Sequence, residues 1–371
     1  MQIAVLAEGK SGERRVSASP DTVKAYVKKG LSVAVQAGAG AGAHISDDAF
    51  VAAGASIIKA DAGLKSADVV LSVRRPSDVA LKSLKKGAVV AAGLDPYGDR
   101  KALDAMAKTG LTLFAMELMP RITRAQSMDI LSSQSNLAGY KAVIDAAAHY
   151  GRALPMMMTA AGTVPPAKIF VMGVGVAGLQ AIATARRLGA IVSATDVRKA
   201  TEEQVKSLGA KFVFADVADA ATAGGYAKEL SAEDKAKQAA LVAEHIKGQD
   251  IVITTALIPG RPAPVLVTKD MVESMKSGSV IVDLAVERGG NCPLSKPDQI
   301  VEHKGVSIMS TVNLAGRLAG NASPLFAKNL ANFLDLMIAA DGSLAINFED
   351  EIIKGTLIAR DGKLVHPMYK A

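Results

Sequence analysis

The chain has 371 residues, of which 50% are hydrophobic, 4% are aromatic and one, Cys292, is cysteine. This length suggests about two domains, and a single cysteine excludes an internal disulfide framework. The formal net charge is +7, but the charges do not cluster and aromatic stacking platforms are missing, so we expect no nucleic-acid binding.

The first third of the chain alternates short apolar runs with amphipathic segments. Helices are expected after Ser19-Pro20 up to Gly30, near 77–87 and near 99–110. Strands are expected at 2–8, 31–38, 67–73, 87–93 and 111–118. Short strands alternating with helices predict βαβ units and one doubly wound parallel-sheet domain before about residue 125.

The same alternation returns after residue 167. A helical pattern over about 128–150 leads to 151–167, which we expect to be a packed irregular connection. Within 216–249 we expect a mobile loop followed by a polar helix. Near the end of the chain we expect a β-ribbon with a turn at Asp361-Gly362. Strands are expected at 168–173, 190–196, 210–216, 250–256, 278–285 and 305–310.

These patterns predict an α/β fold with two doubly wound parallel-sheet, Rossmann-like domains. A long apolar helix follows residue 320, and a late helix in such a chain often returns to the first domain. We therefore expect a discontinuous first domain, 1–127 plus 322–371, and a second domain, 128–321. No run of about 18 apolar residues occurs, so we expect no direct membrane insertion. The N-terminus goes directly into a strand pattern, so no signal peptide is expected.

The strongest chemical signal is "VMGVGVAGLQ", which gives Gly173, Gly175 and Gly178 in the pattern G-x-G-x-x-G. The motif follows a predicted strand and opens a predicted helix. The first glycine permits a tight turn, the second lets a pyrophosphate approach the backbone, and the third lets helix and strand pack closely. The helix N-terminus attracts phosphate, so the motif predicts a dinucleotide site. The alternative is a glycine turn that only packs.

Polar residues at the ends of other strands extend this prediction. Asp196 ends the next strand, where a carboxylate can bind both ribose hydroxyls of NAD and repel a 2′-phosphate. Arg198 is close enough to complicate that preference. Thr255 ends another strand and could touch the ribose or a phosphate, and Asp283 and Glu287 are open to both a ligand and a capping role.

Proton and metal chemistry have few candidates in this sequence. The five histidines show no metal-ligand spacing and Cys292 has no close Cys or His neighbour, so we expect no metal site. The stretch "PRITRAQSMDILSSQSNLAGYKAV", 120–143, is polar in its first half but contains no His, no Cys and no obvious nucleophile. This stretch is suited to binding rather than to proton transfer.

Several long motifs together indicate a family. The stretch 120–143, "MMMTAAGTVPPAKIFVMGVGVAGLQAIATARRLGA", "TAGGYAKE", "ITTALIPGRPAPVL" and "VDLAVERGGNCPLS" closely resemble the NAD(H)-binding component, domain I, of proton-translocating nicotinamide nucleotide transhydrogenases. The resemblance covers essentially the whole chain. That family is similar in fold to alanine dehydrogenase.

The resemblance implies an NAD(P)⁺ transhydrogenase component, Si-side specific, that binds NAD(H) and presents it for direct hydride transfer to NADP⁺ on a partner component. Arg121, Asp129 and Ser132 would orient the nicotinamide, Gln126 would reach towards NADP(H), and Tyr226 would close a mobile lid. The implied cofactor-binding residues are Gly173, Gly175, Val176, Ala177, Gly178, Asp196, Val197, Arg198, Gly225, Tyr226, Thr255, Ala256 and Leu257.

The resemblance also implies an assembly. The chain would be a homodimer that works with an NADP(H)-binding component and a membrane-spanning component. It would be cytoplasmic, held on the cytoplasmic face of the inner membrane through those partners, and the membrane subunits would carry the proton.

Two alternatives stay open. An alanine-dehydrogenase-like NAD-dependent oxidoreductase is favoured by Arg15, which matches the arginine that holds pyruvate in those enzymes. Against it, Arg74 stands where they place a lysine, and "AAGLDPYG" offers no histidine. The second alternative is a non-catalytic NAD-binding module.

Overall fold

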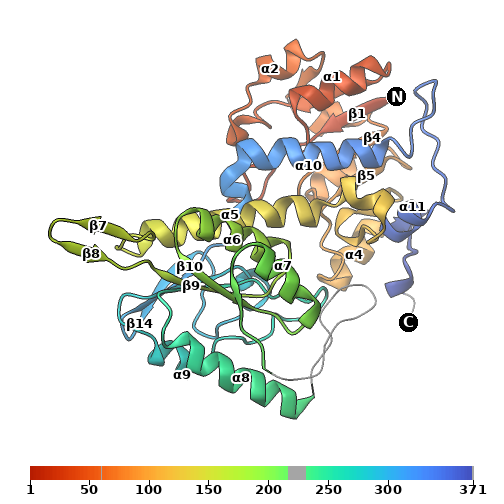
Figure 1. Ribbon diagram of the computed structural model, residues 1–371. Helices are drawn as coiled ribbons and strands as arrows, with labels where there is room; N and C mark the ends of the chain where they lie inside the picture. Colours follow the sequence, from red (N-terminus) through yellow and green to blue (C-terminus); the bar gives the residue numbers. More distant parts are fainter. Residues whose placement is uncertain (60, 216–230, 370–371) are drawn as a thin grey trace. The chain divides into compact units, whose positions relative to one another are not determined.

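The computed structural model describes residues 1–59, 61–215 and 231–369 (Figure 1). By internal contacts the chain divides into two compact units. Unit 1 comprises Met1–Gln134 and Ala315–Ala371, and unit 2 comprises Ser135–Leu314. The chain therefore enters unit 1 twice. The sequence predicts domain boundaries at 127 and 322, and these stay a prediction. The division by contacts falls at Gln134 and Ala315.

Unit 1 is built on a mostly parallel sheet. Its six parallel strands follow the doubly wound order, with the chain reversing direction across the sheet between β1 and β4. An antiparallel pair, β16 and β17, extends the edge beside β6. In spatial order the strands are β17 (Lys363–Leu364), β16 (Leu357–Arg360), β6 (Thr112–Ala115), β5 (Val89–Ala92), β4 (Val69–Leu71), β1 (Gln2–Val5), β2 (Ser32–Gln36) and β3 (Ser56–Ile58).

Apart from α10, the α-helices of unit 1 begin where a side chain caps them. Ser19 and Thr22 form a capping box at the start of α1, and Pro20 occupies its first position, where no backbone N–H is needed. The helices are α1 (Pro20–Lys28), α2 (Asp47–Ala52), α3 (Asp78–Ser83), α4 (Arg100–Ala107), α10 (Ala319–Leu334) and α11 (Glu351–Thr356). Short 3₁₀ turns are η1 (Ala41–Ala43), η2 (Asp61–Leu64), η3 (Met116–Leu118), η4 (Thr123–Met128), η7 (Leu314–Leu318) and η8 (Pro367–Tyr369).

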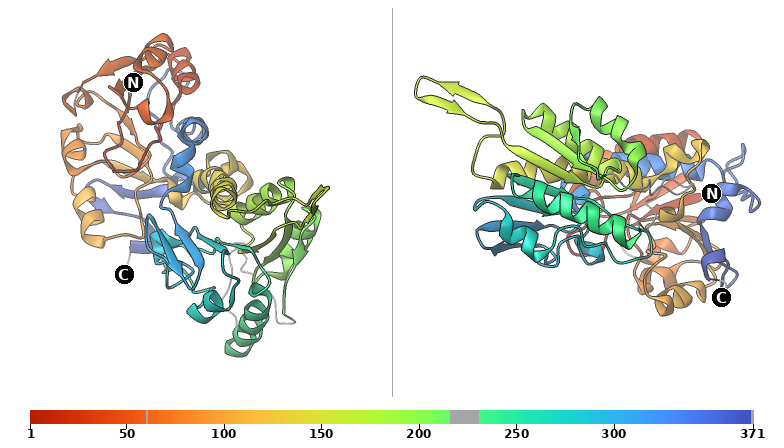
Figure 2. Two further views of the ribbon diagram at one scale, coloured as in Figure 1. Left: turned by 90° about the vertical axis from the view of Figure 1, so that its left-hand side faces the viewer. Right: turned by 60° about the horizontal axis from the view of Figure 1, so that its bottom comes forward.

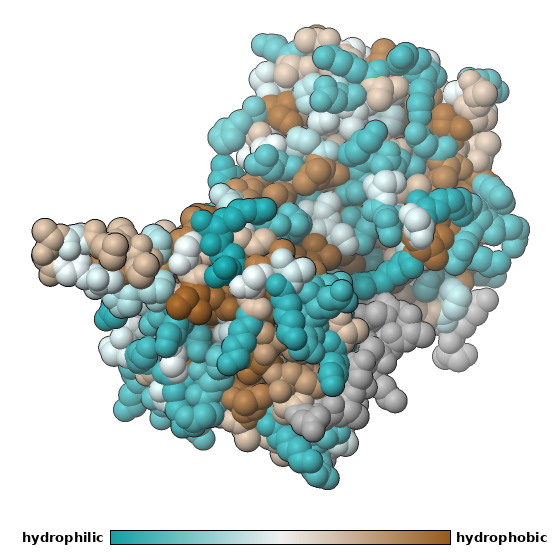
Figure 3. All heavy atoms as spheres, in the orientation of Figure 1, coloured by the Kyte–Doolittle hydropathy of each residue, from teal (hydrophilic) through white to brown (hydrophobic). Residues whose placement is uncertain are grey.

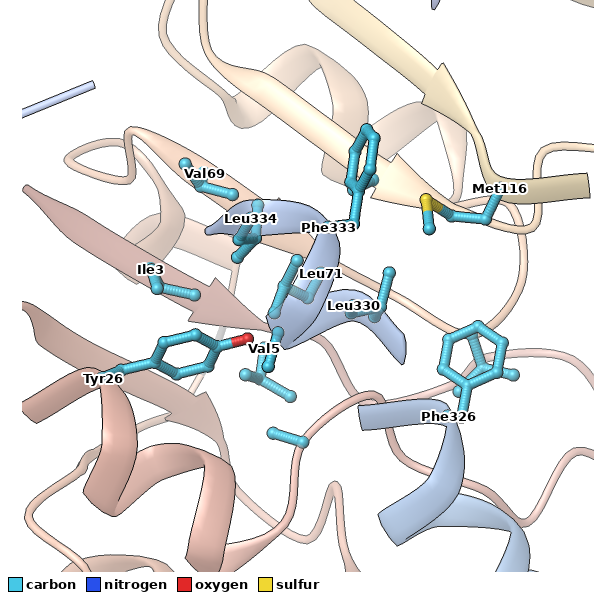
Figure 4. Packing of buried hydrophobic residues seen from close by; sticks show 14 of the residues in the cluster. Ile3, Val5, Tyr26, Val69, Leu71, Met116, Phe326, Leu330, Phe333 and Leu334 are labelled. Atoms are coloured by element: carbon cyan, nitrogen blue, oxygen red, sulfur yellow. The ribbon is translucent and has the colours of Figure 1, made fainter. Parts of the chain in front are cut away.

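Helix α10 supplies much of the core of unit 1, although it lies far along the chain from the strands. Its side chains lie among residues of β1, β4 and α1 (Figure 4). Phe333 is fully buried and meets Phe114 of β6 edge to face, with ring centroids 5.3 Å apart. Burial of these apolar side chains holds the two chain segments of unit 1 together.

Unit 2 repeats the doubly wound order on a second sheet. The chain reverses across this sheet between β9 and β12, and only β14 is antiparallel among the strands described there. In spatial order the strands are β11 (Lys211–Phe212), β10 (Ile191–Thr195), β9 (Lys168–Met172), β12 (Ile251–Thr254), β13 (Val280–Asp283), β15 (Val306–Ser310) and β14 (Gln299–His303). The helices and turns are α5 (Ile130–His149), whose residues 130–134 belong to unit 1, α6 (Val176–Arg187), α7 (Glu202–Ser207), α8 (Ala232–Ile246), α9 (Lys269–Ser274), η5 (Lys199–Thr201) and η6 (Val286–Arg288).

The predicted α/β class with parallel, Rossmann-like sheets is confirmed. The prediction for 151–167 is wrong, because this segment forms an antiparallel hairpin, β7 (Met157–Thr159) and β8 (Gly162–Val164). The hairpin projects from unit 2 (Figures 1 and 2), and Met158 is 79% exposed. Its turn is closed by Thr159, whose hydroxyl accepts from Ala161 N–H and donates to the Gly162 carbonyl.

The predicted terminal ribbon is only partly right. The ribbon is limited to β16 and β17 around Asp361 and Gly362, both at positive φ. The residues before it form α11, because the Asp350 carboxylate caps the N–H groups of Ile352 and Ile353. Among the described residues, no helix is long and apolar enough to cross a membrane. The mobile loop expected at the start of 216–249 falls within 216–230, outside the described residues.

Phe333→Ala should destabilise unit 1 by about 3–5 kcal/mol, because it removes a large buried ring and leaves a cavity. Leu325→Ala on the same helix is the matched control, since Leu325 is 45% exposed. Urea unfolding followed by circular dichroism measures both. Equal losses in the two variants would contradict a core role for α10.

Candidate functional site

The glycine motif of unit 2 forms the turn between β9 and α6. Gly173 has φ +100°, and a Cβ there would lie 2.6 Å from the Thr255 hydroxyl oxygen. A Cβ on Gly178 would lie 1.9 Å from the Gly173 carbonyl oxygen, whereas a Cβ on Gly175 would meet nothing within 4 Å. Two of the glycines are therefore required by packing, and the third leaves the backbone open to a ligand.

The N-terminus of α6 adjoins that open position. Gly175 is its N-cap and no side chain caps it within the described part of the chain. Val176 and Ala177 form the first turn, so their N–H groups and the helix dipole are available to an anion. This end of the sheet, at the β9–β12 reversal, is where doubly wound folds bind nucleotides.

Asp196, directly after β10, is tied to the glycine turn. One carboxylate oxygen accepts from Val174 N–H at 2.7 Å and from Arg198 Nη2 at 2.8 Å. The other accepts from Arg198 N–H at 2.9 Å and Nε at 2.8 Å. Val197 between them is half-buried. The carboxylate expected at the ribose is thus also a structural anchor of the turn.

The loop after β12 contains Thr255, Ala256 and Leu257. The Thr255 hydroxyl donates to the Gly173 carbonyl at 3.0 Å, which joins this loop to the glycine turn. Buried Asn291 accepts from Ala256 N–H and donates to the Ala256 carbonyl. Its side-chain amide thus satisfies both backbone groups of Ala256, as a neighbouring strand would, and fixes the loop. Leu257 is exposed. Sequence analysis missed Asn291, whose only signal was a polar residue after two glycines.

Gly139 of α5 was also missed. A Cβ on this residue would lie 2.1 Å from the Ala177 carbonyl oxygen, so α5 and the start of α6 touch backbone to backbone. A glycine inside a long helix costs about 1 kcal/mol relative to alanine, and such a residue usually has a packing reason. Gly225 and Tyr226, predicted to bind the cofactor, lie outside the described residues.

The polar loop belongs to unit 1 and runs through η4 into α5. Asp129 caps α5: its carboxylate accepts from Leu131 N–H, Ser132 N–H and the Ser132 hydroxyl, the last at 2.5 Å. Arg121 and Gln126 are exposed. Within the described residues the Gln126 side chain makes no hydrogen bond. Of the four predicted residues, Asp129 and Ser132 are therefore hydrogen-bonded to each other, and Arg121 and Gln126 are exposed on the surface of unit 1.

Side chains from the second segment of unit 1 hold the polar loop in place. Asn329 and Asn332 of α10 both donate to the Ser127 carbonyl. Arg124 forms an ion pair at 2.8 Å with Asp350, the cap of α11. The polar loop is thus exposed, but its backbone is held by contacts from α10 and from the start of α11.

A buried charge cluster lies at the β1–β4 reversal of unit 1. Arg15, 6% exposed, donates through Nε and Nη2 to Glu13 and through Nη1 to Gln134. Arg74 also donates to Glu13, at 2.9 Å. Burial alone raises the pKa of the Glu13 carboxyl, but the hydrogen bonds and charges of the two arginines outweigh it and bring that pKa to about 2.

Two domain-family models match the chain: "Alanine dehydrogenase/PNT, N-terminal domain" over residues 4–138 and "Alanine dehydrogenase/PNT, C-terminal domain" over residues 142–367. The chain belongs to the alanine dehydrogenase/PNT family.

Within that family the chain is similar to transhydrogenase components along its whole length. The first portion of the NAD(P) transhydrogenase alpha subunit of Rhodospirillum rubrum is 57% identical over 99% of this chain and 98% of its own. The solved transhydrogenase from Sinorhizobium meliloti, 57% identical, superimposes with a TM-score of 0.91 over 98% of this chain and 100% of that one. A solved L-alanine dehydrogenase, 26% identical, gives 0.84 over 99% and 98%. The resemblance stated from the sequence is confirmed.

Membership in this family implies nicotinamide nucleotide binding. In the part of the chain that the structure describes, no group of three or more His, Cys, Asp or Glu side chains could hold a metal ion. Cys292 is buried, and burial raises the pKa of its thiol, which disfavours the nucleophilic thiolate.

Gly178→Ala should destabilise unit 2 by at least about 2 kcal/mol, because the new methyl group overlaps the Gly173 carbonyl. Alanine ordinarily stabilises a helix relative to glycine, so the sign of the effect is itself diagnostic. Gly175→Ala, next to open space, should change the unfolding free energy by no more than about 0.5 kcal/mol. Denaturant unfolding of both variants is the measurement. A stabilised Gly178→Ala protein would refute the close approach.

Proposed function

We propose that this chain binds NAD(H) and presents it for direct hydride transfer to NADP⁺ on a separate component of a proton-translocating, Si-side specific transhydrogenase. The observation that carries the proposal is the full-length likeness to the first portion of the transhydrogenase alpha subunit, together with the glycine turn and Asp196 at the β9–β12 reversal. Thr255, Ala256, Leu257 and the start of α6 complete the proposed NAD(H) site.

The polar loop supports hydride transfer rather than acid–base catalysis. In the proposed reaction NADH becomes NAD⁺ and NADP⁺ becomes NADPH, so no proton has to be taken up or released by a side chain. Arg121, Asp129 and Ser132 hold and orient the nicotinamide in the proposal, and the exposed Gln126 reaches the second nucleotide. Their contribution is proximity and orientation.

The assembly follows from the same proposal. The relative from Rhodospirillum rubrum bears the name of one portion of one subunit of a transhydrogenase. We propose that this chain acts with an NADP(H)-binding component and a membrane-spanning component that carries the proton. It would thus be held on the cytoplasmic face of the inner membrane through its partners.

One observation favours an alanine-dehydrogenase-like activity instead. Buried Arg15 and nearby Arg74 lie at the strand reversal of unit 1, where open α/β sheets bind ligands, and two arginines suit a carboxylate. Against this function, Glu13 already accepts from both arginines.

A hydride-transfer assay tests the main proposal. The purified chain is mixed with NADH and the thionicotinamide analogue of NADP⁺, whose reduced form absorbs at longer wavelength than NADH. Turnover should require a bacterial NADP(H)-binding component. Gln126→Ala should slow transfer by about tenfold to a hundredfold, since misplacement is that costly, and should leave NADH binding by the chain alone unchanged.

Thr123→Ala is the matched control on the same loop, because Thr123 is exposed and makes no side-chain hydrogen bond within the described residues. Equal turnover in Gln126→Ala and Thr123→Ala would remove Gln126 from the proposed site. NADH oxidation by pyruvate and ammonia without any partner would replace the proposal with the alanine-dehydrogenase-like function.

We also propose that the chain forms a homodimer and that hairpin β7–β8 packs on the second copy. An isolated two-stranded hairpin is marginally stable in water. This one exposes Met157 and Met158 by 44% and 79%, and Met156 just before it by 60%. Figure 3 shows pale brown, moderately hydrophobic residues along the projection. An exposed apolar projection of this kind is typical of an association surface.

Met158→Asp should therefore shift the protein towards monomer, because a carboxylate would be buried at the contact. Size-exclusion chromatography with light scattering over a range of concentrations measures this. Val79→Asp is the control, since Val79 is 69% exposed on α3 of unit 1. A monomeric unaltered protein, or a Met158→Asp dimer of unchanged affinity, would contradict the proposal.

A further inference from the structure

The Asp196 carboxylate already has a full set of hydrogen-bond donors inside the chain. A carboxylate offers about four lone-pair positions. Val174 N–H takes one, and Arg198 takes the other three through its backbone N–H, Nε and Nη2. The Arg198 fork binds both oxygens at 2.8 Å, the bidentate geometry that makes arginine–carboxylate pairs strong.

The pair is also sheltered and braced. The side chains of Arg198 and Asp196 are 19% and 7% exposed, so solvent screens their attraction less than that of a surface pair. Arg198 Nη2 additionally donates to the Val174 carbonyl at 3.2 Å, which links the guanidinium to the glycine turn itself. The Val174 N–H and the Arg198 backbone N–H hold Asp196 in place whatever the guanidinium does.

We infer that Arg198 is a specificity-determining residue that competes with the adenosine ribose for Asp196. A ribose hydroxyl can donate to Asp196 only if Nε or Nη2 releases an oxygen. The guanidinium also neutralises the charge that would repel a 2′-phosphate. Arg198 thus lowers the affinity for NAD(H) and, more strongly, lowers the discrimination against NADP(H).

The inference rests on the proposed function and deepens it. Arg198 follows Asp196 by only two residues, so its backbone is fixed by the same turn and its released guanidinium stays near the 2′ position. A side chain beside the 2′ position affects the relative affinities for NAD(H) and NADP(H). It has no part in the hydride step, whose proposed residues lie in unit 1.

The test is fluorescence titration of NADH and NADPH against the full chain and its Arg198→Ala variant. Without the competitor, the Kd for NADH should fall by about threefold to tenfold, the effect expected for one charge-assisted pair. Because Asp196 then keeps its full charge, the ratio of the NADPH Kd to the NADH Kd should rise by at least about tenfold.

Arg187→Ala is the control for net charge, because Arg187 lies exposed at the end of α6. It should leave the ratio unchanged. An unchanged ratio in Arg198→Ala, or equal weakening of NADH and NADPH binding, would overturn the inference while leaving the proposed function standing. Failure of the unaltered chain to bind NADH would instead overturn the proposed function and the inference with it.

Discussion

Acidic side chains at the carboxyl ends of the strands hold the loops from which both candidate sites are built. In unit 1, Glu8 after β1 accepts from two N–H groups beyond β4, and Glu117 after β6 accepts from two beyond β5. In unit 2, Asp196 accepts from the glycine turn, and Asp283 at the end of β13 accepts from three N–H groups of the following loop. Where parallel strands end, backbone N–H groups lose their sheet partners, and a carboxylate is the strongest replacement.

Burying a carboxylate to hold a loop is energetically unfavourable, and the pKa values of two buried glutamates in unit 1 show this. Burial raises the pKa of the Glu8 and Glu117 carboxyls even though several backbone N–H groups act against it. The main role of these carboxylates is therefore to hold the loops in shape. Any contact with a ligand comes in addition to that role. Asp196 shows the consequence, because its oxygens already accept from Val174 N–H and from Arg198, and a ribose can be served only where Arg198 releases a position.

The features that follow from local constraints could be predicted from the sequence. The glycine turn is an example, since positive φ at Gly173 and the tight space at Gly178 leave the residue type little choice. Contacts between distant segments could not be predicted: Gly139 meets Ala177 only after α5 and α6 have packed, and Asn291 reaches Ala256 from the loop that follows β13. The hairpin was missed for a different reason, because three methionines ordinarily indicate burial and these are exposed. Helix α11 did have a local signal, the capping residue Asp350, which sequence analysis passed over.

In the polar loop, finally, Asp129 and Ser132 are arranged to present hydrogen-bond acceptors rather than protons. The Ser132 hydroxyl already donates its only proton to Asp129, so towards a ligand its oxygen can only accept. Asp129 is itself engaged by the first N–H groups of α5, which hold the carboxylate in one orientation. A carboxamide NH₂ is a donor that such a fixed acceptor can hold at one angle. Under the proposed function, the geometry that starts a helix also orients the nicotinamide ring, and the loop needs no acid or base.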